Sequence, residues 1–185
     1  MSWSVLGSLV AVPALDRPDL LADAVAHVLT TLDPADAARI GVAEIDPTLA
    51  DTAAFCEAYG SPLDASANCV VVAGKRGGDT RYAACLVLAT TRADVNGVVR
   101  RRIDARRASF APMDDAVELT GMEYGGITPV GLPEGWPLLV APEVAAAEAV
   151  VVGSGIRGSK LAIPGALVAS LPGAEVLADL ARAVG

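Results

Sequence analysis

The sequence predicts a mixed α/β domain built on a largely antiparallel sheet. Short apolar segments typical of strands outnumber what a simple alternation of strand and helix would give, and helical segments lie between them. Two of the strands, 68–73 and 82–89, are joined by a short segment rich in glycine and charge, which is typical of an antiparallel hairpin. A length of 185 residues and a hydrophobic content of 53% fit one domain with a substantial core.

Helices are predicted where apolar residues recur at helical spacing and a breaking residue closes the segment. Leu21, Val25 and Val28 recur in this way in the first helix, which the Asp33-Pro34 pair ends. Gly60 ends the second helix. The predicted helices are 18–32, 51–59, 94–103, 113–119, 166–170 and 175–183, with a helical turn at 144–147.

The predicted strands are short apolar segments bounded by glycine, proline or charged residues. The hairpin encloses a predicted turn at 74–79. No repeat or low-complexity tract interrupts the pattern, and the one candidate boundary lies near 34–39. The predicted strands are 41–45, 68–73, 82–89, 108–111, 137–140, 149–152 and 160–163.

Composition excludes several classes of protein. No run of about eighteen apolar residues lacks charge or proline, so no transmembrane helix is expected. The apolar N-terminus has no basic region before it, which argues against a secretory signal. Three cysteines without metal-type spacing and a single histidine predict reduced thiols, no metal site and no cofactor. We expect a cytoplasmic protein that does not contact membranes.

Charge is distributed unevenly along the chain. The net charge of −8 argues against a general nucleic-acid binder. The segment from Lys75 to Arg107, however, holds nine basic residues against three acidic residues, so it is net +6 and the remainder is net −14. This segment is interpreted either as a phosphate-facing side or as an ordinary solvated helix with its flanking loops.

Two glycine-rich loops, 121–131 and 150–160, are the strongest functional signal. Glycine at this density lets backbone amides approach a ligand closely, because no Cβ blocks the way. Apolar segments typical of strands flank each loop, so each loop is expected to be held on a rigid frame, where binding sites usually lie. A hydroxyl in each loop, Thr128 and Ser154, either stabilises its own turn or orients a ligand.

Three other features of the sequence are typical of binding or catalytic sites. The segment Gly153 to Gly158 matches a dinucleotide-binding glycine pattern, which requires a helix directly after it and a further parallel strand. An extended segment follows instead, and only 27 residues remain, so the sequence argues against a dinucleotide site. His27 lies on the predicted first helix, far along the chain from the loops, and is interpreted as a surface residue. Lys160 could reach the pocket between the loops and supply a cation there.

The two loops, in this order and spacing, resemble the YbaK-like family of aminoacyl-tRNA deacylases, which includes the editing domain of some prolyl-tRNA synthetases. The Gly-x-x-x-Pro loop of that family is matched by Gly125 to Pro129, and its Gly-Ser/Ala-Gly turn by Gly153 to Gly155. The resemblance covers 39–185 and implies a bent, barrel-like sheet surrounded by helices. Residues 1–38 would then be an N-terminal helical extension packed against that domain.

The resemblance also implies a chemistry. Family members hydrolyse the ester that joins a wrong amino acid to tRNA, without a metal, and loop amides bind the carbonyl oxygen. The family lysine that holds the substrate is replaced here by Asn68, which carries no charge. The implied catalytic residues are Asn68, Gly125, Gly126 and Thr128, and the implied substrate-binding residues are Pro129, Gly153, Ser154 and Gly155.

Three hypotheses follow. The first is a stand-alone trans-editing deacylase that binds aminoacyl-tRNA through the basic segment from Lys75 to Arg107. The second is a module that binds a tRNA 3′ end or a small amino-acid-like ligand without hydrolysis. The third is an interaction protein that uses the arginine-rich face, whose tRNA affinity would fall steeply with salt.

Overall fold

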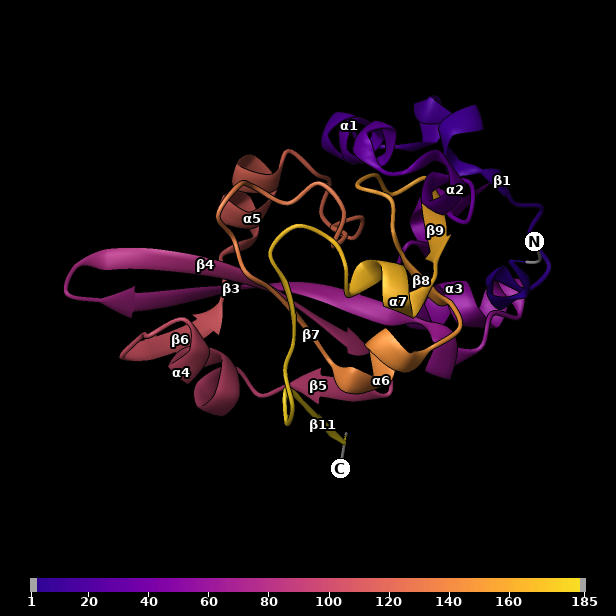
Figure 1. Ribbon diagram of the computed structural model, residues 1–185. Helices are drawn as coiled ribbons and strands as arrows, with labels where there is room; N and C mark the ends of the chain where they lie inside the picture. The colour runs from indigo at the N-terminus through magenta and orange to yellow at the C-terminus, as the bar shows by residue number, and fades with distance from the viewer. Residues whose placement is uncertain (1–2, 184–185) are drawn as a thin grey trace.

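The computed structural model describes residues 3–183 and arranges the strands in three sheets around a shared interior (Figure 1). A five-stranded sheet has the order β10-β7-β4-β3-β6, a four-stranded sheet has the order β1-β2-β9-β8, and a two-stranded sheet pairs β11 with β5. An isolated parallel bridge between Ser66 and Val151 joins the two larger sheets. The strands are β1 (Val12–Pro13), β2 (Gly41–Glu44), β3 (Ala67–Arg76), β4 (Asp79–Leu88), β5 (Thr91–Ala93), β6 (Arg107–Phe110), β7 (Leu138–Val140), β8 (Val150–Gly153), β9 (Ser159–Ile163), β10 (Ala174–Val176) and β11 (Ala181–Ala183).

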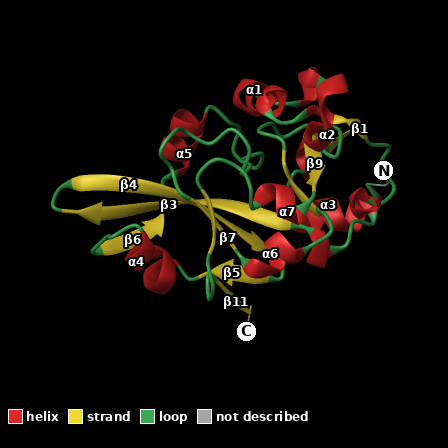
Figure 2. Cartoon of the chain, viewed as in Figure 1, coloured by secondary structure: helices red, strands yellow, loops and turns green. Residues whose placement is uncertain are grey.

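Short helices surround these sheets, as the ribbon coloured by secondary structure shows (Figure 2). The α-helices are α1 (Asp23–Thr31), α2 (Pro34–Ala37), α3 (Thr52–Tyr59), α4 (Arg100–Arg102), α5 (Met113–Thr120), α6 (Pro142–Ala146) and α7 (Gly165–Val168). Single 3₁₀ turns cover Ser4–Leu6, Ala14–Asp16, Pro18–Leu20, Pro47–Leu49 and Leu63–Ala65. Only β7 pairs in parallel with its neighbours β4 and β10, so the predicted mixed α/β fold with largely antiparallel pairing is confirmed.

The β3–β4 hairpin is longer than the sequence predicted. Its ladder continues to the pair Arg76 and Asp79, so the predicted turn at 74–79 is wrong. The turn consists of Gly77 and Gly78 alone, with φ of 59° and 98°. Two consecutive positive φ values match the right-handed twist of a tight hairpin, and glycine adopts them without a steric penalty.

Two predicted helices take a different form in the structure. The predicted helix 18–32 breaks near Leu21 because the Ala22 N–H donates to the Ser154 carbonyl, 3.1 Å away, and α1 begins only at Asp23. The predicted helix 94–103 is a π-helical segment, Val95–Val99, followed by the short α4. The carboxylate of Asp94 accepts the N–H groups of Gly97 and Val98, which satisfies donors at the start of this segment and anchors it.

The predicted C-terminal helix 175–183 is wrong. This segment forms β10 and β11 instead, and Figure 2 draws the chain after α7 as loop and strand. A helix of nine residues is marginal by itself, whereas the open edges of β7 and β5 offer backbone hydrogen bonds to an extended chain. Tertiary pairing therefore overrides the local helical pattern.

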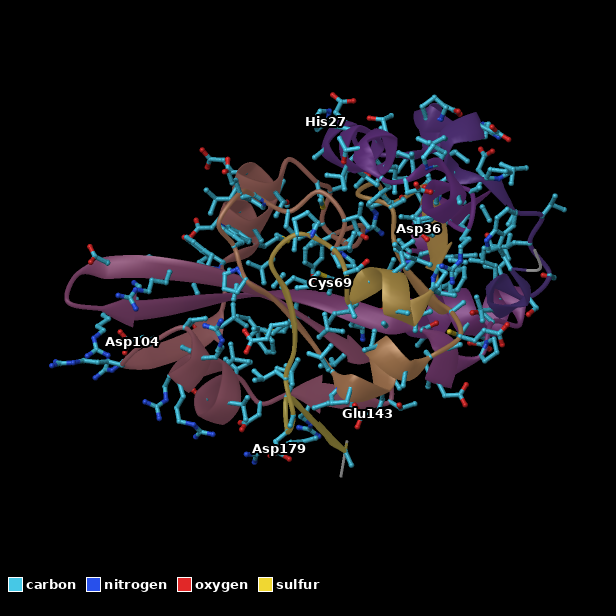
Figure 3. All side chains as sticks on the ribbon, in the orientation of Figure 1. His27, Asp36, Cys69, Asp104, Glu143 and Asp179 are labelled. Atoms are coloured by element: carbon cyan, nitrogen blue, oxygen red, sulfur yellow. The ribbon has the colours of Figure 1, made fainter. Side chains whose placement is uncertain are left out.

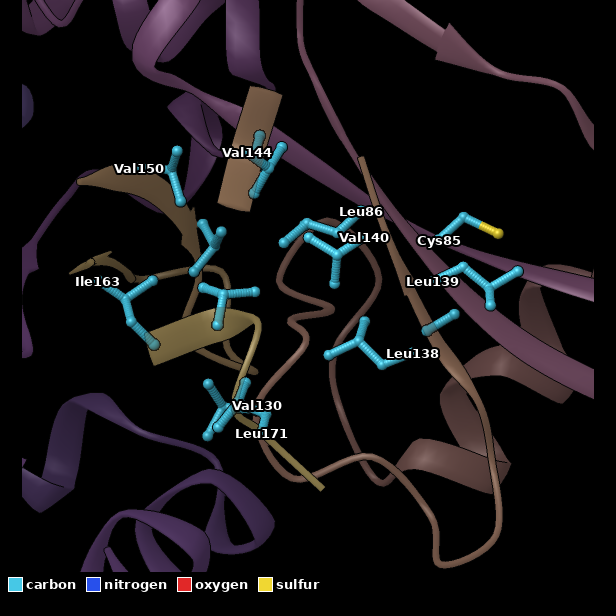
Figure 4. Close-up of a cluster of buried hydrophobic side chains, with 14 of the residues drawn as sticks. Cys85, Leu86, Val130, Leu138, Leu139, Val140, Val144, Val150, Ile163 and Leu171 are labelled. Carbon is cyan, nitrogen blue, oxygen red and sulfur yellow. The ribbon is translucent and has the colours of Figure 1, made fainter. Parts of the chain in front are cut away.

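The main hydrophobic core lies between the large sheet and the helices that follow β7 and β9 (Figure 4). All three residues of β7 are fully buried, because the strand has a neighbour on each edge and side-chain contacts on both faces. Val144 of α6 and Ile163 of β9 pack on the same cluster. The rigid core thus supports the ends of β8 and β9, where the second glycine loop begins and ends.

The segment before residue 39 is integrated with the rest of the molecule. Leu20, Val25 and Leu29 belong to the main core, and β1 adds an edge strand to β2. Figure 1 places α1, α2 and β1 together beside β9. The predicted division into 1–38 and 39–185 stays a prediction.

Candidate functional site

A pocket of about 750 Å³ opens between the first half of β3, the N-terminal end of α3, and the two glycine loops. One wall is strand β3 from Ala67 to Val71. Cys69 belongs to this wall and is labelled near the centre of Figure 3. Most of the lining is apolar. Its polar or charged side chains, apart from the thiol of Cys69, are Asp51, Thr52, Ser66, Asn68, Tyr124, Arg157 and Lys160.

The two glycine loops are in direct contact at this pocket. The Gly155 N–H donates to the Gly126 carbonyl at 2.8 Å, and the Glu123 N–H donates to the Gly155 carbonyl at 2.9 Å. A Cβ on Gly153 would lie 2.2 Å from the Gly126 carbonyl oxygen, a distance that no side chain tolerates. The loops therefore meet by backbone contact, which requires glycine where they meet.

Arg157, a residue of the second loop, holds the first loop in place. Its guanidinium donates from Nη1 to the Tyr124 carbonyl and from Nη2 to the Pro47 carbonyl, each at 3.0 Å. Its backbone N–H donates to the Glu123 carboxylate at 2.6 Å. Three segments distant in sequence are thus fixed around one half-buried arginine at the pocket rim.

The first loop presents backbone donors that the protein does not use. Gly125 and Ile127 both line the pocket, and neither backbone N–H donates a hydrogen bond to any other group in residues 3–183. Gly125 is exposed and has a φ of 85°, a conformation that favours glycine. These two N–H groups are available to a ligand oxygen.

Asn68 and Thr52 form a polar pair in the pocket. The Thr52 hydroxyl donates to Oδ1 of Asn68 at 2.8 Å, which leaves both N–H groups of the Asn68 amide without a protein partner in the described chain. Thr52 is the first residue of α3, whose N-cap Asp51 accepts the N–H groups of Ala53 and Ala54. A capped helix start thus positions Thr52, and Thr52 orients Asn68.

Lys160 is buried in the same pocket. Its side chain leaves β9, and its ammonium donates to the Ala50 carbonyl at 2.8 Å and lies 5.6 Å from the centre of the Phe55 ring. Only 6% of the residue is exposed. Burial lowers the pKa of this ammonium, and the nearby charge of Asp51 opposes that shift.

The residues singled out from the sequence divide into two groups. The structure brings Asn68, Gly125 and Gly153 to the lining of the pocket. The other five are buried behind its wall: Gly126, Thr128, Pro129, Ser154 and Gly155. Their functional roles stay predictions.

Ser154 and Thr128 differ in how their hydroxyls are satisfied. The Ser154 and Ser159 hydroxyls are 2.6 Å apart, and Ser159 donates to the Leu20 carbonyl at 2.6 Å. Ser154 therefore links the second loop to the N-terminal segment. The Thr128 hydroxyl is fully buried and has no hydrogen-bond partner within residues 3–183.

Sequence reasoning missed Thr52, Phe55 and Arg157 as pocket residues. Arg157 lies inside the glycine pattern, but its importance depends on contacts with Tyr124 and Pro47 that spacing cannot reveal. For Lys160 a signal was present, because a lysine inside an apolar strand is unusual and calls for a partner.

The remaining candidates for nucleophile or metal chemistry lie elsewhere or are inert. His27 is exposed on the outer side of α1, away from Cys69 in Figure 3. Burial raises the pKa of the Cys69 thiol far above its usual range and that of Cys85 to about 12, so both are poor nucleophiles. Within the described residues, no three histidine, cysteine, aspartate or glutamate side chains cluster as metal ligands.

The basic segment separates into paired and unpaired cations. Arg76 and Arg81 both pair with Asp104, at the far end of the hairpin in Figure 3. Four other cations line a second groove of about 700 Å³ and have no salt bridge within residues 3–183; they are Lys75, Arg100, Arg106 and Arg107. Phe110 lines this basic groove and also the pocket, and it is 61% exposed.

Comparison with known proteins gives the class to which this fold and pocket belong. The aminoacyl-tRNA editing domain family matches residues 46–170. A solved structure of a protein described as a candidate trans-editing enzyme for prolyl-tRNA synthetase is 22% identical, with a TM-score of 0.69, over 84% of this chain and 94% of that one. A scaffold used in computational epitope grafting is 20% identical, with a TM-score of 0.68, over 85% and 97% of the two chains. A hypothetical protein is 22% identical, with a TM-score of 0.62, over 72% and 85%.

These structural likenesses, at such low identity, show the fold. No curated protein sequence matches the chain. The family match covers more than half of the residues, and the protein therefore belongs to the aminoacyl-tRNA editing domain family, which confirms the resemblance. In the part of the chain that the structure describes, no helix is long and apolar enough to cross a membrane.

Proposed function

We propose that the protein hydrolyses the ester between a wrongly attached amino acid and tRNA, acting on tRNA that is free of its synthetase. The observation that carries this proposal is one pocket lined both by Gly125 and Ile127, whose N–H groups have no partner in the described chain, and by the polar pair of Asn68 and Thr52. Family membership supplies the class of substrate. A cytoplasmic location fits a substrate of this kind.

The chemistry follows from the donors. Attack of water on the ester carbonyl develops negative charge on the carbonyl oxygen, and fixed N–H donors stabilise that charge by roughly 3–4 kcal/mol each. The loop donors are held in place by Arg157 and by the contact between the loops, so little reorganisation is needed during the reaction. A ribose hydroxyl of the tRNA would assist the attacking water.

The basic groove is the proposed site for the tRNA backbone. Its four unpaired cations are suited to phosphate groups, and it carries a single carboxylate, Asp115, which accepts a hydrogen bond from the Tyr82 hydroxyl. Phe110 belongs to both the groove and the pocket, so a tRNA end in the groove would bring its acyl group to the pocket.

The test is release of labelled amino acid from a panel of mischarged tRNAs. We expect measurable release from at least one tRNA, and a fall of about tenfold to a hundredfold in Gly125→Ala, because an added Cβ at a φ of 85° displaces the loop donors. Gly135→Ala is the matched control, since Gly135 has a φ of 81°, is exposed, and has open space around the added Cβ. Equal activity of the two variants would exclude the pocket as the site.

Asn68 provides a second test. Asn68→Lys places a cation beside Thr52, and we expect it to raise the rate of a slow wild type. A fast wild type together with an unaffected Asn68→Lys variant would show that this position does not take part in hydrolysis.

A second candidate function is binding without hydrolysis. It is favoured by the absence, in the described lining of the pocket, of a free carboxylate or an imidazole that could act as a base: Asp51 is used as a helix cap. Tight binding of uncharged or mischarged tRNA with no release of amino acid from any member of the panel would select this function over the first.

A further inference from the structure

Lys160 presents a charge that the folded protein does not neutralise. It is one of two lysines in the sequence, and only 6% of it is exposed. Its hydrogen-bond partner is the neutral carbonyl of Ala50, and no carboxylate in residues 3–183 forms a salt bridge with it. Burial of an ammonium is costly unless it is paired, so a lysine retained here calls for an explanation.

The position of this ammonium is fixed by the surrounding structure. Lys160 lies on the central strand β9, paired with Ala43 on one side and Gly153 on the other. These small neighbours leave room for the side chain to extend to the pocket. The hydrogen bond to Ala50 and the ring of Phe55 then hold its end.

The two donor groups, Lys160 and Asn68, are held by residues that lie close together in the sequence. Lys160 is bound to the carbonyl of Ala50, and Asn68 is bound to the hydroxyl of Thr52, two residues further along. One of the three ammonium donors is used, and neither N–H of the Asn68 amide has a protein partner in the described chain. This part of the pocket therefore offers donors and lacks acceptors for them.

The charged groups around Lys160 do not remove the excess of positive charge. Asp51 is the one carboxylate among the described lining residues, and it is committed to the N-terminus of α3. Arg157 adds a second cation at the rim, and the Cys56 thiol, 3.3 Å from the Ser66 hydroxyl, is the other titratable group that acts on Lys160. A ligand with an electron-rich oxygen would complete the arrangement.

We propose that Lys160, together with the Asn68 amide, binds an oxygen acceptor of the acyl group in the pocket, and is a substrate-positioning residue. The acceptor is either the carbonyl oxygen of the aminoacyl linkage or an oxygen on the amino-acid side chain. This inference rests on the proposed function for the identity of the ligand as an acyl group. It does not require that the ligand be hydrolysed.

Binding of two hydrolysis-resistant probes tests the proposal and separates the two acceptors. The probes are 3′-alanylamino-3′-deoxyadenosine, which carries only the linkage carbonyl, and its aspartylamino counterpart, which adds a side-chain carboxylate. We expect Lys160→Met to weaken binding of at least one probe by about tenfold to a hundredfold, and Lys160→Arg to weaken it less. Weaker binding of both probes by Lys160→Met would identify the linkage carbonyl as the acceptor. Weaker binding of the aspartyl probe alone would identify the side-chain oxygen as the acceptor.

Arg39→Met is the matched control, because it removes a cation that is not buried and that lies outside both the pocket and the basic groove. Should Lys160→Met fold poorly, ¹³C-dimethylation of the two lysines in the wild type gives the same answer by NMR. The Lys160 signal should move when probe is added. Unchanged affinity in Lys160→Met, or an unchanged Lys160 signal at saturating probe, would overturn the proposal.

Failure of this inference is distinguishable from failure of the proposed function. If the wild type binds a probe through Lys160 but releases no amino acid from any tRNA, the deacylase proposal fails and the role of Lys160 stands. If Lys160→Met binds both probes and turns over tRNA as the wild type does, the role of Lys160 fails and the deacylase proposal stands.

Discussion

The two glycine loops are alike in composition and differ in what their backbone does. In the first loop, Gly125 is exposed and its N–H has no partner in the described chain. In the second loop, Ser154 and Gly155 are buried, and the Gly155 N–H is bonded to the carbonyl of Gly126. One loop therefore offers donors to a ligand, while the other uses its polar groups to hold the first in place.

This difference shows that a glycine-rich segment is not by itself a ligand-binding segment. In the second loop, Gly153 is required for steric reasons, because it abuts the carbonyl of Gly126. Gly155 is required both for its backbone conformation and for steric reasons, because its φ is 89° and its added Cβ would lie 2.4 Å from the Cβ of Ala22. In the first loop, Gly125 is required chiefly for its positive φ, since the atom closest to the added Cβ is Nη1 at the end of the Arg157 side chain and not a backbone atom.

The largest effect is expected at Gly153, where the second loop abuts the first. We expect Gly153→Ala to destabilise the protein by about 3 kcal/mol or more, because the new Cβ would lie 2.2 Å from a backbone oxygen that cannot move without separating the loops. Thermal or urea unfolding measures the change, and deacylation should fall with it. Gly158→Ala, in the same loop, is the control: its added Cβ meets only Pro47 at 3.9 Å, so a change within about 0.5 kcal/mol is expected. Equal stability of the two variants would contradict the steric account.

Ser154 tests whether the second loop has a structural role alone. We expect Ser154→Ala to cost about 1–2 kcal/mol of unfolding free energy, because the buried Ser159 hydroxyl loses one of its two partners, the Ser154 hydroxyl 2.6 Å away, and keeps the Leu20 carbonyl. Activity per folded molecule should not change, since Ser154 lies behind the pocket wall. Steady-state kinetics at a temperature well below the unfolding transition gives that comparison. A large rise in KM with little loss of stability would instead place Ser154 in substrate binding, as the sequence predicted.

Arg157 is the contact through which the second loop acts on the first. Arg157→Ala removes hydrogen bonds to Tyr124 and Pro47, and we expect a loss of stability of about 1 kcal/mol because the side chain is half-exposed. The first loop should become less ordered, so KM for a mischarged tRNA should rise more than the unfolding free energy falls. Amide hydrogen exchange at Gly125 and Gly126 gives an independent measurement. Unchanged exchange there would show that the contact between the loops is sufficient without the arginine.

The comparison also shows what the sequence could and could not predict. Order, spacing and flanking strands were enough to single out both loops, and in the structure Asn68, Gly125 and Gly153 line one pocket. Local pattern failed at 175–183, where the open edges of two strands decide the conformation. It also could not separate ligand-facing residues from buried ones within a loop, because that depends on contacts with residues as distant as Leu20 and Pro47.

The smallest effect we expect is a change in how stability depends on pH, and it concerns the one buried cation next to the second loop. Burial lowers the pKa of Lys160 in the folded state, whereas in the unfolded chain the lysine returns to about 10.4. The unfolded state therefore binds the proton more tightly, and protonation of Lys160 favours unfolding at pH values below the folded pKa. As the pH rises between the lowered folded pKa and about 10.4, this penalty disappears and the free energy of unfolding increases. Lys160→Met lacks the group, so the stability of the wild type minus that of the variant should rise as the pH increases toward about 10.4. Groups common to both proteins cancel in this difference. A difference that stays flat or falls with pH would mean that the folded protein stabilises the ammonium at least as well as water does.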